Sequence, residues 1–246
     1  MKHGYTLIKN FLEDHTLEKL ESTLTHFHKE WCQKNKDFYQ SHAVNSAYIT
    51  HHKTMSPKDR LFLFQLLSSQ KIQTELDKIF QKKDACFLNT QLFFNPLNKA
   101  QKNYWHRDIQ YSDLPIKAQK YAIEKHPNNV VHFRIALKDE PGIELIPDTH
   151  KRWDTDLEYD IRHKQNGKDV FNPLPNGRSI PLSKGDLLIF SANMIHRGLY
   201  GKDRLAFDII YCAPDPDILK YVDTDCCPNE SELLQLENRA LFKHFT

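Results

Sequence analysis

Residues 184–196 read KGDLLIFSANMIH, a glycine turn followed by an apolar run that ends in a histidine. Short runs rich in β-branched and aromatic residues, separated by Gly, Pro, Asn and Asp, are typical of strands. The chain repeats this pattern in CFLNTQLFFNP from residue 86, VVHFRIALKD from 130, GIELIP from 142, SIPLS from 179 and RLAFDIIYC from 204. These runs predict a region of short strands over residues 85–213.

Helical patterns precede this region, after a short strand-like start. Asp14 is a candidate cap for a helix whose apolar residues recur at steps of three and four: Leu17, Leu20, Leu24, Phe27 and Trp31. Ser56 and Pro57 predict the start of a second helix, because a cap residue stands before a proline at the first helical position. Residues 72–79 predict a third helix, and Ser231 is a candidate cap for a closing helix near the C-terminus.

Helices first and strands afterwards predict an antiparallel barrel or sandwich, mainly β with flanking α-helices. A length of 246 residues is within the range of one such domain. We expect helical support with the first strand over 1–84, the strand-rich core over 85–213, and a tail with a helix over 214–246. Two long polar connections, 110–129 and 150–178, predict lids or binding loops, or else disordered segments.

The composition excludes several classes of protein. Lys and Arg number 34 against 32 Asp and Glu, so the net charge of +2 gives no reason to expect a nucleic-acid or membrane partner. Five cysteines without a Cys-x-x-Cys pair indicate neither a disulfide framework nor a thiolate zinc site. No apolar stretch matches a signal peptide or a membrane span. We therefore predict a cytoplasmic protein, and the sequence indicates no oligomeric state.

His106 and Asp108 form a His-x-Asp motif within YWHRD. Alternate residues of a strand point to the same face, so both side chains can reach one metal ion. His28 and Glu30 have the same spacing within a predicted helix, where the side chains diverge, and we give them no role. His196 offers a third ligand. Two histidines and one carboxylate, with the other positions open, form the ligand set of non-haem Fe(II) oxygenases.

Arg204 lies eight residues after His196, behind the turn-like Gly201-Lys202-Asp203. A hairpin here would place His196 and Arg204 on neighbouring strands, about 4.8 Å apart. An arginine fork meets a carboxylate through two parallel hydrogen bonds and keeps its charge. We therefore expect one small molecule to contact both the metal and Arg204.

These motifs together resemble the phytanoyl-CoA dioxygenase family of Fe(II)- and 2-oxoglutarate-dependent oxygenases, whose fold is a double-stranded β-helix of the jelly-roll, cupin-like kind. The resemblance covers GYTLIKNFL, Trp-His-x-Asp, GIELIPDTH, KGDLLIFSANMIHRG and the returning arginine. It implies Fe(II) on His106, Asp108 and His196, with Arg204 on the distal carboxylate of 2-oxoglutarate. It also implies O2 as co-substrate, and hydroxylation of a small molecule with release of succinate and CO2.

The stretch QLFFN, residues 91–95, resembles the strand before the metal motif in the ectoine hydroxylases of this family. There a glutamine and an asparagine four residues apart face the co-substrate, which implies Gln91 and Asn95 as co-substrate-binding candidates. Residues i and i+4 share a strand face, so the geometry permits both.

Two departures from the family pattern bear on the site. Asp148 replaces the glycine of the Pro-Gly-Ser-His turn, and we expect the turn to survive because aspartate tolerates a left-handed conformation. Gly198 stands where some relatives carry a hydroxyl that contacts the co-substrate. No coenzyme A site is readable in the sequence. Candidates to face the substrate lie on the motif strands or at their ends: Arg107, Tyr111, Arg134, Glu144 and Asn193.

Several other functions compete with this interpretation. A barrel that binds metal or 2-oxoglutarate without turnover, or a protein hydroxylase of the same metal class, stays open. Nucleic-acid dealkylases of this class resemble one another in a second arginine six residues after the first, where Ile210 stands here. A halogenase is disfavoured because Asp108 supplies the carboxylate that halogenases lack. A protein kinase is disfavoured because Asp113 stands where its catalytic loop requires asparagine.

Overall fold

The computed structural model describes residues 1–80, 84–97 and 103–244. Two antiparallel sheets form its centre, with strand orders β1-β7-β4-β9-β3-β2 and β6-β5-β8. The larger sheet comprises β1 (Tyr5–Ile8), β2 (Ser46–Tyr48), β3 (Cys86–Phe94), β4 (Val130–Ala136), β7 (Leu187–Ser191) and β9 (Leu205–Cys212). The smaller sheet comprises β5 (Glu140–Leu145), β6 (Arg178–Leu182) and β8 (His196–Gly198). This arrangement confirms the predicted double-stranded β-helix, whereas the domain boundaries stay a prediction.

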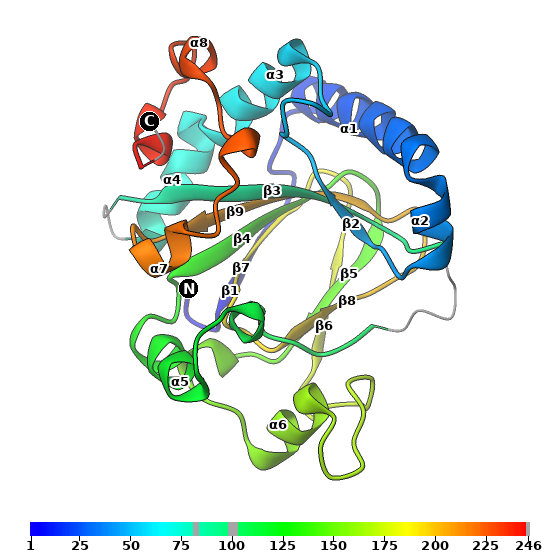
Figure 1. Cartoon of the computed structure of the whole chain (residues 1–246), viewed down its shortest axis with the longest axis vertical. Coiled ribbons are helices and arrows are strands. Elements are labelled where there is room, and N and C mark those ends of the chain that lie inside the picture. The colour runs from blue at the N-terminus through cyan, green and yellow to red at the C-terminus, as the bar shows by residue number, and fades with distance from the viewer. Residues whose placement is uncertain (81–83, 98–102, 245–246) are drawn as a thin grey trace.

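Helices cover the outer face of the larger sheet, as Figure 1 shows for α1 (Asp14–Lys34), α3 (Pro57–Leu67) and α4 (Gln70–Phe80). These are the three N-terminal helices predicted from the sequence. The Ser56 hydroxyl accepts a hydrogen bond from the Asp59 amide at 3.1 Å, which confirms that residue as a cap. Asp14 is the first helical residue rather than the cap of α1, and Glu13 takes the cap position.

The remaining helices are short. α2 (Lys36–Ser41) follows α1, while α5 (Ile116–Lys125) and α6 (Asp156–His163) lie within the two connections predicted as lids or loops. α7 (Pro216–Leu219) and α8 (Glu230–Leu233) lie in the C-terminal tail. The predicted closing helix is therefore broken into short turns, and Asn229 rather than Ser231 caps α8. Among the helices that the structure describes, none has both the length and the apolar character needed to cross a bilayer.

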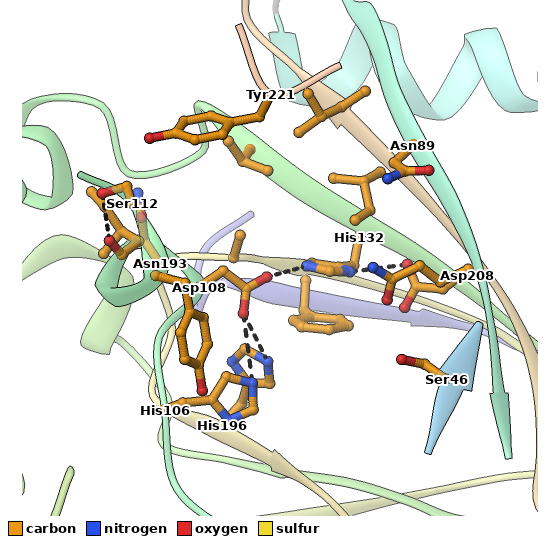
Figure 2. A pocket seen from close by; sticks show the side chains of 18 of the residues that line it. Ser46, Asn89, His106, Asp108, Ser112, His132, Asn193, His196, Asp208 and Tyr221 are labelled. Atoms are coloured by element: carbon orange, nitrogen blue, oxygen red, sulfur yellow. Dashed lines mark hydrogen bonds and ion pairs between the residues drawn. The ribbon is translucent and has the colours of Figure 1, made fainter. Parts of the chain in front are cut away.

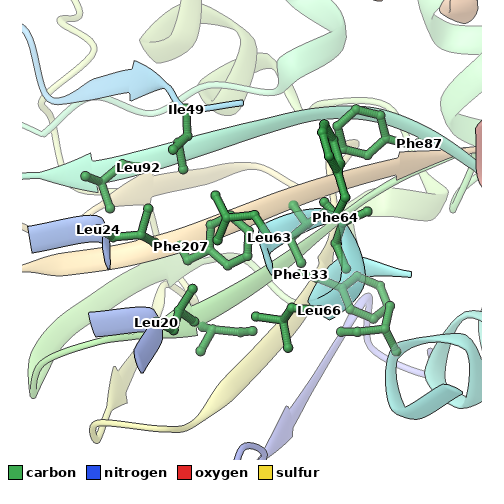
Figure 3. Packing of buried hydrophobic residues seen from close by; sticks show 14 of the residues in the cluster. Leu20, Leu24, Ile49, Leu63, Phe64, Leu66, Phe87, Leu92, Phe133 and Phe207 are labelled. Carbon is green, nitrogen blue, oxygen red and sulfur yellow. The ribbon is translucent and has the colours of Figure 1, made fainter. Parts of the chain in front are cut away.

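The alternation of side chains along the strands separates a helix-facing core from an inner face. Figure 3 shows Phe133 of β4 and Phe207 of β9 packed with Leu20 and Leu24 of α1 and Leu63 of α3. Each of these five side chains is fully buried. Because strand neighbours point to opposite faces, the residues on either side of Phe133 and Phe207 point inward, toward the smaller sheet. The inner face of the larger sheet therefore carries the polar residues of β4 and β9.

Asp148 adopts the left-handed conformation expected for the PDTH turn, with φ of 66° and ψ of −2°. Its carboxylate also lies 3.0 Å from Nδ1 of His3, and its amide donates to the His3 carbonyl at 3.2 Å. The prediction that aspartate maintains this turn without glycine is confirmed. The contact holds the N-terminal segment against the end of β5.

Candidate active site

His106, Asp108 and His196 each bring one possible ligand atom within 4.8 Å of the other two (Figure 2). The two histidines are joined by a pair of backbone hydrogen bonds of 2.9 and 3.0 Å, which form an isolated antiparallel bridge. Arg107 is extended, as the strand-like spacing of the His-x-Asp motif predicts, but among the described residues His106 forms only this single bridge and Asp108 begins a short 3-10 helix that ends at Tyr111. The side chains converge because the chain is extended through Arg107 and turns at Asp108.

The hydrogen bonds of the two histidines fix which ring nitrogen is free. Nδ1 of His106 lies 3.1 Å from the Tyr104 carbonyl, and Nδ1 of His196 lies 3.0 Å from the Met194 carbonyl. A carbonyl only accepts, so Nδ1 carries the proton and Nε2 keeps its lone pair. The two Nε2 atoms face Oδ1 of Asp108 at 3.6 and 3.5 Å.

The charge states of these groups match a divalent cation. Burial lowers the pKa of both histidines, in the case of His196 to about 3, so both rings are neutral at physiological pH. Burial alone would raise the pKa of Asp108, but the neighbouring His132 outweighs it and holds that pKa below its usual value. Two neutral imidazole nitrogens and one carboxylate oxygen therefore converge, which is the donor set of a non-haem Fe(II) site.

Arg204 lies just before β9 and is only 3% exposed. β8 pairs with β5 in the smaller sheet, whereas β9 pairs with β3 and β4 in the larger one. The expectation that His196 and Arg204 lie on paired strands of one hairpin is therefore wrong. The turn between β8 and β9 crosses from one sheet to the other, so the two residues line the same cavity from opposite sheets.

The guanidinium of Arg204 is only partly satisfied within the described part of the chain. Nη1 donates to the Phe94 carbonyl at 3.3 Å, while Nε has no hydrogen-bond partner and lies 3.6 Å from Glu140. Glu140 instead accepts bonds of 2.9 and 3.0 Å from Arg134. Burial, together with the nearby Arg134, lowers the pKa of Arg204 to about 9. A buried cation with an unused donor fits a ligand carboxylate.

A cavity of about 700 Å³ connects these groups. Most of the site residues predicted from the sequence line this cavity: His106, Asp108, His196, Arg204, Gln91, Tyr111, Arg134 and Asn193. Within this set Arg134 is paired with Glu140, and the Asn193 amide donates to Asn129 at 3.0 Å. Tyr111 is more available, because it is exposed and its ring lies 5.9 Å from that of His106.

Three predicted residues make contacts outside the lining of this cavity. Arg107 is fully buried and pairs with Asp154 at 2.8 Å. Glu144 pairs with Arg197 at 2.6 Å. Asn95 lies beyond the end of β3, so the strand alternation that would align it with Gln91 does not reach it. Its amide bonds to the backbone at two places, Gly201 and Lys202, and so supports the turn before Arg204.

Sequence reasoning missed His132 and Asp208, which extend the site away from the metal ligands (Figure 2). Nε2 of His132 lies 2.6 Å from Oδ2 of Asp108, and Nδ1 lies 2.9 Å from Oδ1 of Asp208. Burial opposes a charge on His132, but the two carboxylates outweigh it and raise its pKa to about 10. The alternation of side chains along the strand VVHFRIA could have placed His132 on the inner face of the sheet. It could not have shown that Asp108 and Asp208 are the hydrogen-bond partners of His132.

A second group of possible metal ligands, formed by His51, His52 and Asp225, lies near the surface. Nε2 of His51 faces Asp225 at 3.5 Å, but Nδ1 of the same ring accepts a hydrogen bond from the Lys53 amide at 3.1 Å. The neutral ring therefore carries its proton on Nε2, and that atom offers no lone pair to a metal. The donor chemistry favours the triad of His106, Asp108 and His196 over this group.

Fold and site together define a non-haem iron oxygenase that uses 2-oxoglutarate. The chain belongs to the phytanoyl-CoA dioxygenase family, whose family model matches residues 1–200. The match includes His106, Asp108 and His196 and ends before Arg204, so the interpretation of Arg204 depends on the geometry above. No curated protein sequence matches the chain.

Solved structures of proteins that hold iron or 2-oxoglutarate, or that depend on α-ketoglutarate, share the fold at low sequence identity. HygX from Streptomyces hygroscopicus with iron bound aligns with a TM-score of 0.62 at 14% identity, over 87% of this chain and 83% of that one. EctD from S. alaskensis with 2-oxoglutarate and 5-hydroxyectoine aligns with a TM-score of 0.59 at 12% identity, over 86% and 73%. SnoN, an α-ketoglutarate-dependent epimerase from nogalamycin biosynthesis, aligns with a TM-score of 0.55 at 14% identity, over 86% and 79%.

Proposed function

We propose that His106, Asp108 and His196 hold Fe(II), that Arg204 anchors the distal carboxylate of 2-oxoglutarate, and that the enzyme hydroxylates a small molecule in the adjoining cavity. The observation that carries this proposal is the pair of free Nε2 atoms facing one oxygen of Asp108. Iron bound there supplies the activation of O2, coupled to the conversion of 2-oxoglutarate to succinate and CO2.

The side chains contribute binding and orientation. The Tyr104 and Met194 carbonyls hold the two imidazole rings in the tautomer that presents Nε2. Arg204 offers a fixed fork to a carboxylate, and its burial strengthens that interaction by excluding water. Gln91 lies opposite Asp208 in the register of β3 and β9, and it faces the same cavity as a second co-substrate contact.

Tyrosines surround the outer part of the cavity, where we place the substrate. Tyr111, Tyr121 and Tyr221 all line it, as do Leu114 and Ile218. Such a wall offers hydroxyl groups and apolar ring faces to a small organic molecule. Tyr111, close to His106, is our first candidate among the predicted substrate-facing residues.

The proposal also covers the cell compartment and the partners. A cavity of about 700 Å³ and a net charge of only +2 support a small-molecule substrate rather than a nucleic acid or a membrane surface. The five cysteines are all free thiols, which supports a reducing compartment such as the cytoplasm. Because the neighbour SnoN is described as an epimerase, the fate of the substrate is best tested separately from the turnover of the co-substrate.

Anaerobic titration with Fe(II) and then 2-oxoglutarate tests the site through the visible charge-transfer band of the chelate. We expect the band in the wild type and its loss in His196→Ala. Arg204→Ala removes the two charge-assisted hydrogen bonds of the fork, each worth about 1.5–3 kcal/mol, so the 2-oxoglutarate Kd rises at least about 100-fold. Arg178→Ala, at an exposed arginine of β6, is the matched control and keeps the wild-type Kd.

Two outcomes would contradict the proposal. If the well-folded wild-type protein shows no charge-transfer band, it has no site that binds Fe(II) and 2-oxoglutarate as a chelate. A band without succinate release under air, across a broad panel of small molecules, favours a binding protein on the same fold. Succinate release that a small molecule stimulates supports the oxygenase and opens the identification of its product.

A further inference from the structure

The two oxygens of Asp108 lie in different surroundings (Figure 2). Oδ1 faces the Nε2 atoms of His106 and His196 at 3.6 and 3.5 Å. Oδ2 lies 2.6 Å from Nε2 of His132, on the side away from the two histidines. One oxygen is therefore free for a metal ion, and the other is already engaged by the protein.

His132 is itself fixed in place by three contacts. Nδ1 lies 2.9 Å from Oδ1 of Asp208, which is only 1% exposed on β9. Its ring stacks on that of Phe190 of β7, with 4.6 Å between centroids and 8° between planes. Carboxylates at neutral pH only accept hydrogen bonds, so both ring nitrogens of His132 donate. The ring cannot rotate without losing both bonds and the stacking contact.

We propose that His132, held by Asp208, is a positioning residue that makes Asp108 a ligand through one oxygen only. The inference rests on the proposed function and goes beyond the three ligands. A carboxylate that is free to turn can bind a metal through both oxygens. That would occupy one of the positions that the keto acid and O2 require. His132 holds Oδ2 away and so keeps that position open.

A substitution series can separate this role from a structural one, because two amides mimic the two ends of the ring. His132→Gln places its amide nitrogen near the position of Nε2 and keeps a donor for Asp108. His132→Asn places its amide near Nδ1, so it keeps the Asp208 side and leaves Asp108 without a donor. A role in stability alone predicts that both variants bind metal equally well.

Co(II) is the probe, because its visible absorption reports the coordination number without turnover. We expect His132→Asn to raise the Co(II) Kd about 10- to 100-fold, the usual effect of losing a partner of a metal ligand. We also expect the visible absorption of Co(II) to weaken, because the second oxygen of Asp108 would bind the metal and raise its coordination number. His132→Gln is expected to keep the wild-type Kd and spectrum. His126→Phe, at a cavity histidine whose ring lies 6.0 Å from that of Tyr121, serves as the metal-binding control.

Asp208→Asn provides a second route if His132→Asn melts too early to titrate. Asparagine keeps an acceptor oxygen for Nδ1 but removes the negative charge, so it weakens the hydrogen bond that holds the ring. We expect a smaller rise in the Co(II) Kd with the same change in spectrum. His132→Asn with wild-type Kd and wild-type spectrum in folded protein overturns the positioning role. Wild type that binds no Co(II) overturns the proposed metal site itself, so the two failures are distinct.

Discussion

Gly198→Ser distinguishes what the family resemblance implies from what this structure predicts. Some relatives carry a hydroxyl at this position and use it to contact the co-substrate, so resemblance alone suggests that serine would tighten 2-oxoglutarate binding. In this chain a Cβ atom at Gly198 would lie 2.9 Å from Nη2 of Arg204, and ordinary contact begins at 3.4 Å. The guanidinium would therefore have to move by about 0.5 Å.

The surroundings of Arg204 oppose such a movement. The guanidinium lies 5.5 Å from the ring centroid of Phe93 and 5.3 Å from that of Tyr200, and Nη1 bonds to the Phe94 carbonyl. A displaced fork aligns with only one carboxylate oxygen, which removes one charge-assisted bond worth about 1.5–3 kcal/mol. The 2-oxoglutarate Kd is therefore expected to rise about 10- to 150-fold.

The assay is anaerobic titration with 2-oxoglutarate at saturating Fe(II), followed through the chelate band, for wild type, Gly198→Ala and Gly198→Ser. Metal affinity, measured separately, should stay unchanged because Gly198 bonds to β5 only through its backbone. Equal weakening in both variants identifies the Cβ collision with Arg204. Serine that binds as tightly as the wild type, or more tightly, would refute the reasoning.

Three further predictions address stability and charge. His150 is fully buried, and burial lowers its pKa from 6.5 to about 4. The free energy of unfolding should therefore fall by about 3 kcal/mol as the pH is lowered from 6.5 to 4, because His150 takes up its proton at a higher pH in the unfolded chain than in the folded one. Urea unfolding of His150→Phe should not show this pH dependence. Glu232→Gln breaks a buried pair with Arg60, with bonds of 3.0 Å, and should cost about 3 kcal/mol in urea unfolding without changing the 2-oxoglutarate Kd. Glu140→Gln leaves Arg134 and Arg204 without their shared anion, so it should lower the melting temperature of the apoprotein and tighten 2-oxoglutarate binding; looser binding would contradict the idea that Glu140 competes with the co-substrate.

Local patterns predicted the elements well where one face of an element is buried against one partner. The helix over Asp14–Lys34 was readable because Leu17, Leu20 and Leu24 recur at helical spacing and lie in the core. β4 was readable because VVHFRIALKD is a β-branched and aromatic run bounded by turn residues. In both cases the residues that form the pattern are close in sequence.

Pairing between elements was not readable in the same way. The hairpin expected between His196 and Arg204 assumed that sequence neighbours pair, but in this fold the chain changes sheet between β8 and β9. The His-x-Asp motif was assigned to a strand from its spacing, although a two-residue bridge and a turn place its side chains. His132 was not singled out at all, because its role depends on carboxylates 24 and 76 residues away.

One strand face organises both halves of the site. His132 and Arg134 are successive inward residues of β4, and each begins a series of contacts between charged side chains. His132 contacts Asp108, which is one of the metal ligands. Arg134 contacts Glu140, which lies 3.6 Å from Arg204. In each series the first two side chains are hydrogen-bonded to each other, His132 to Asp108 and Arg134 to Glu140. One further group is left for a ligand, namely Oδ1 of Asp108 in the first series and the Nε donor of Arg204 in the second. A slip of β4 by one residue would point Phe133 into the cavity and bury both polar residues against the helices. The register of β4, held by β7 on one side and β9 on the other, therefore sets the distance between the metal and the carboxylate anchor that one co-substrate must span.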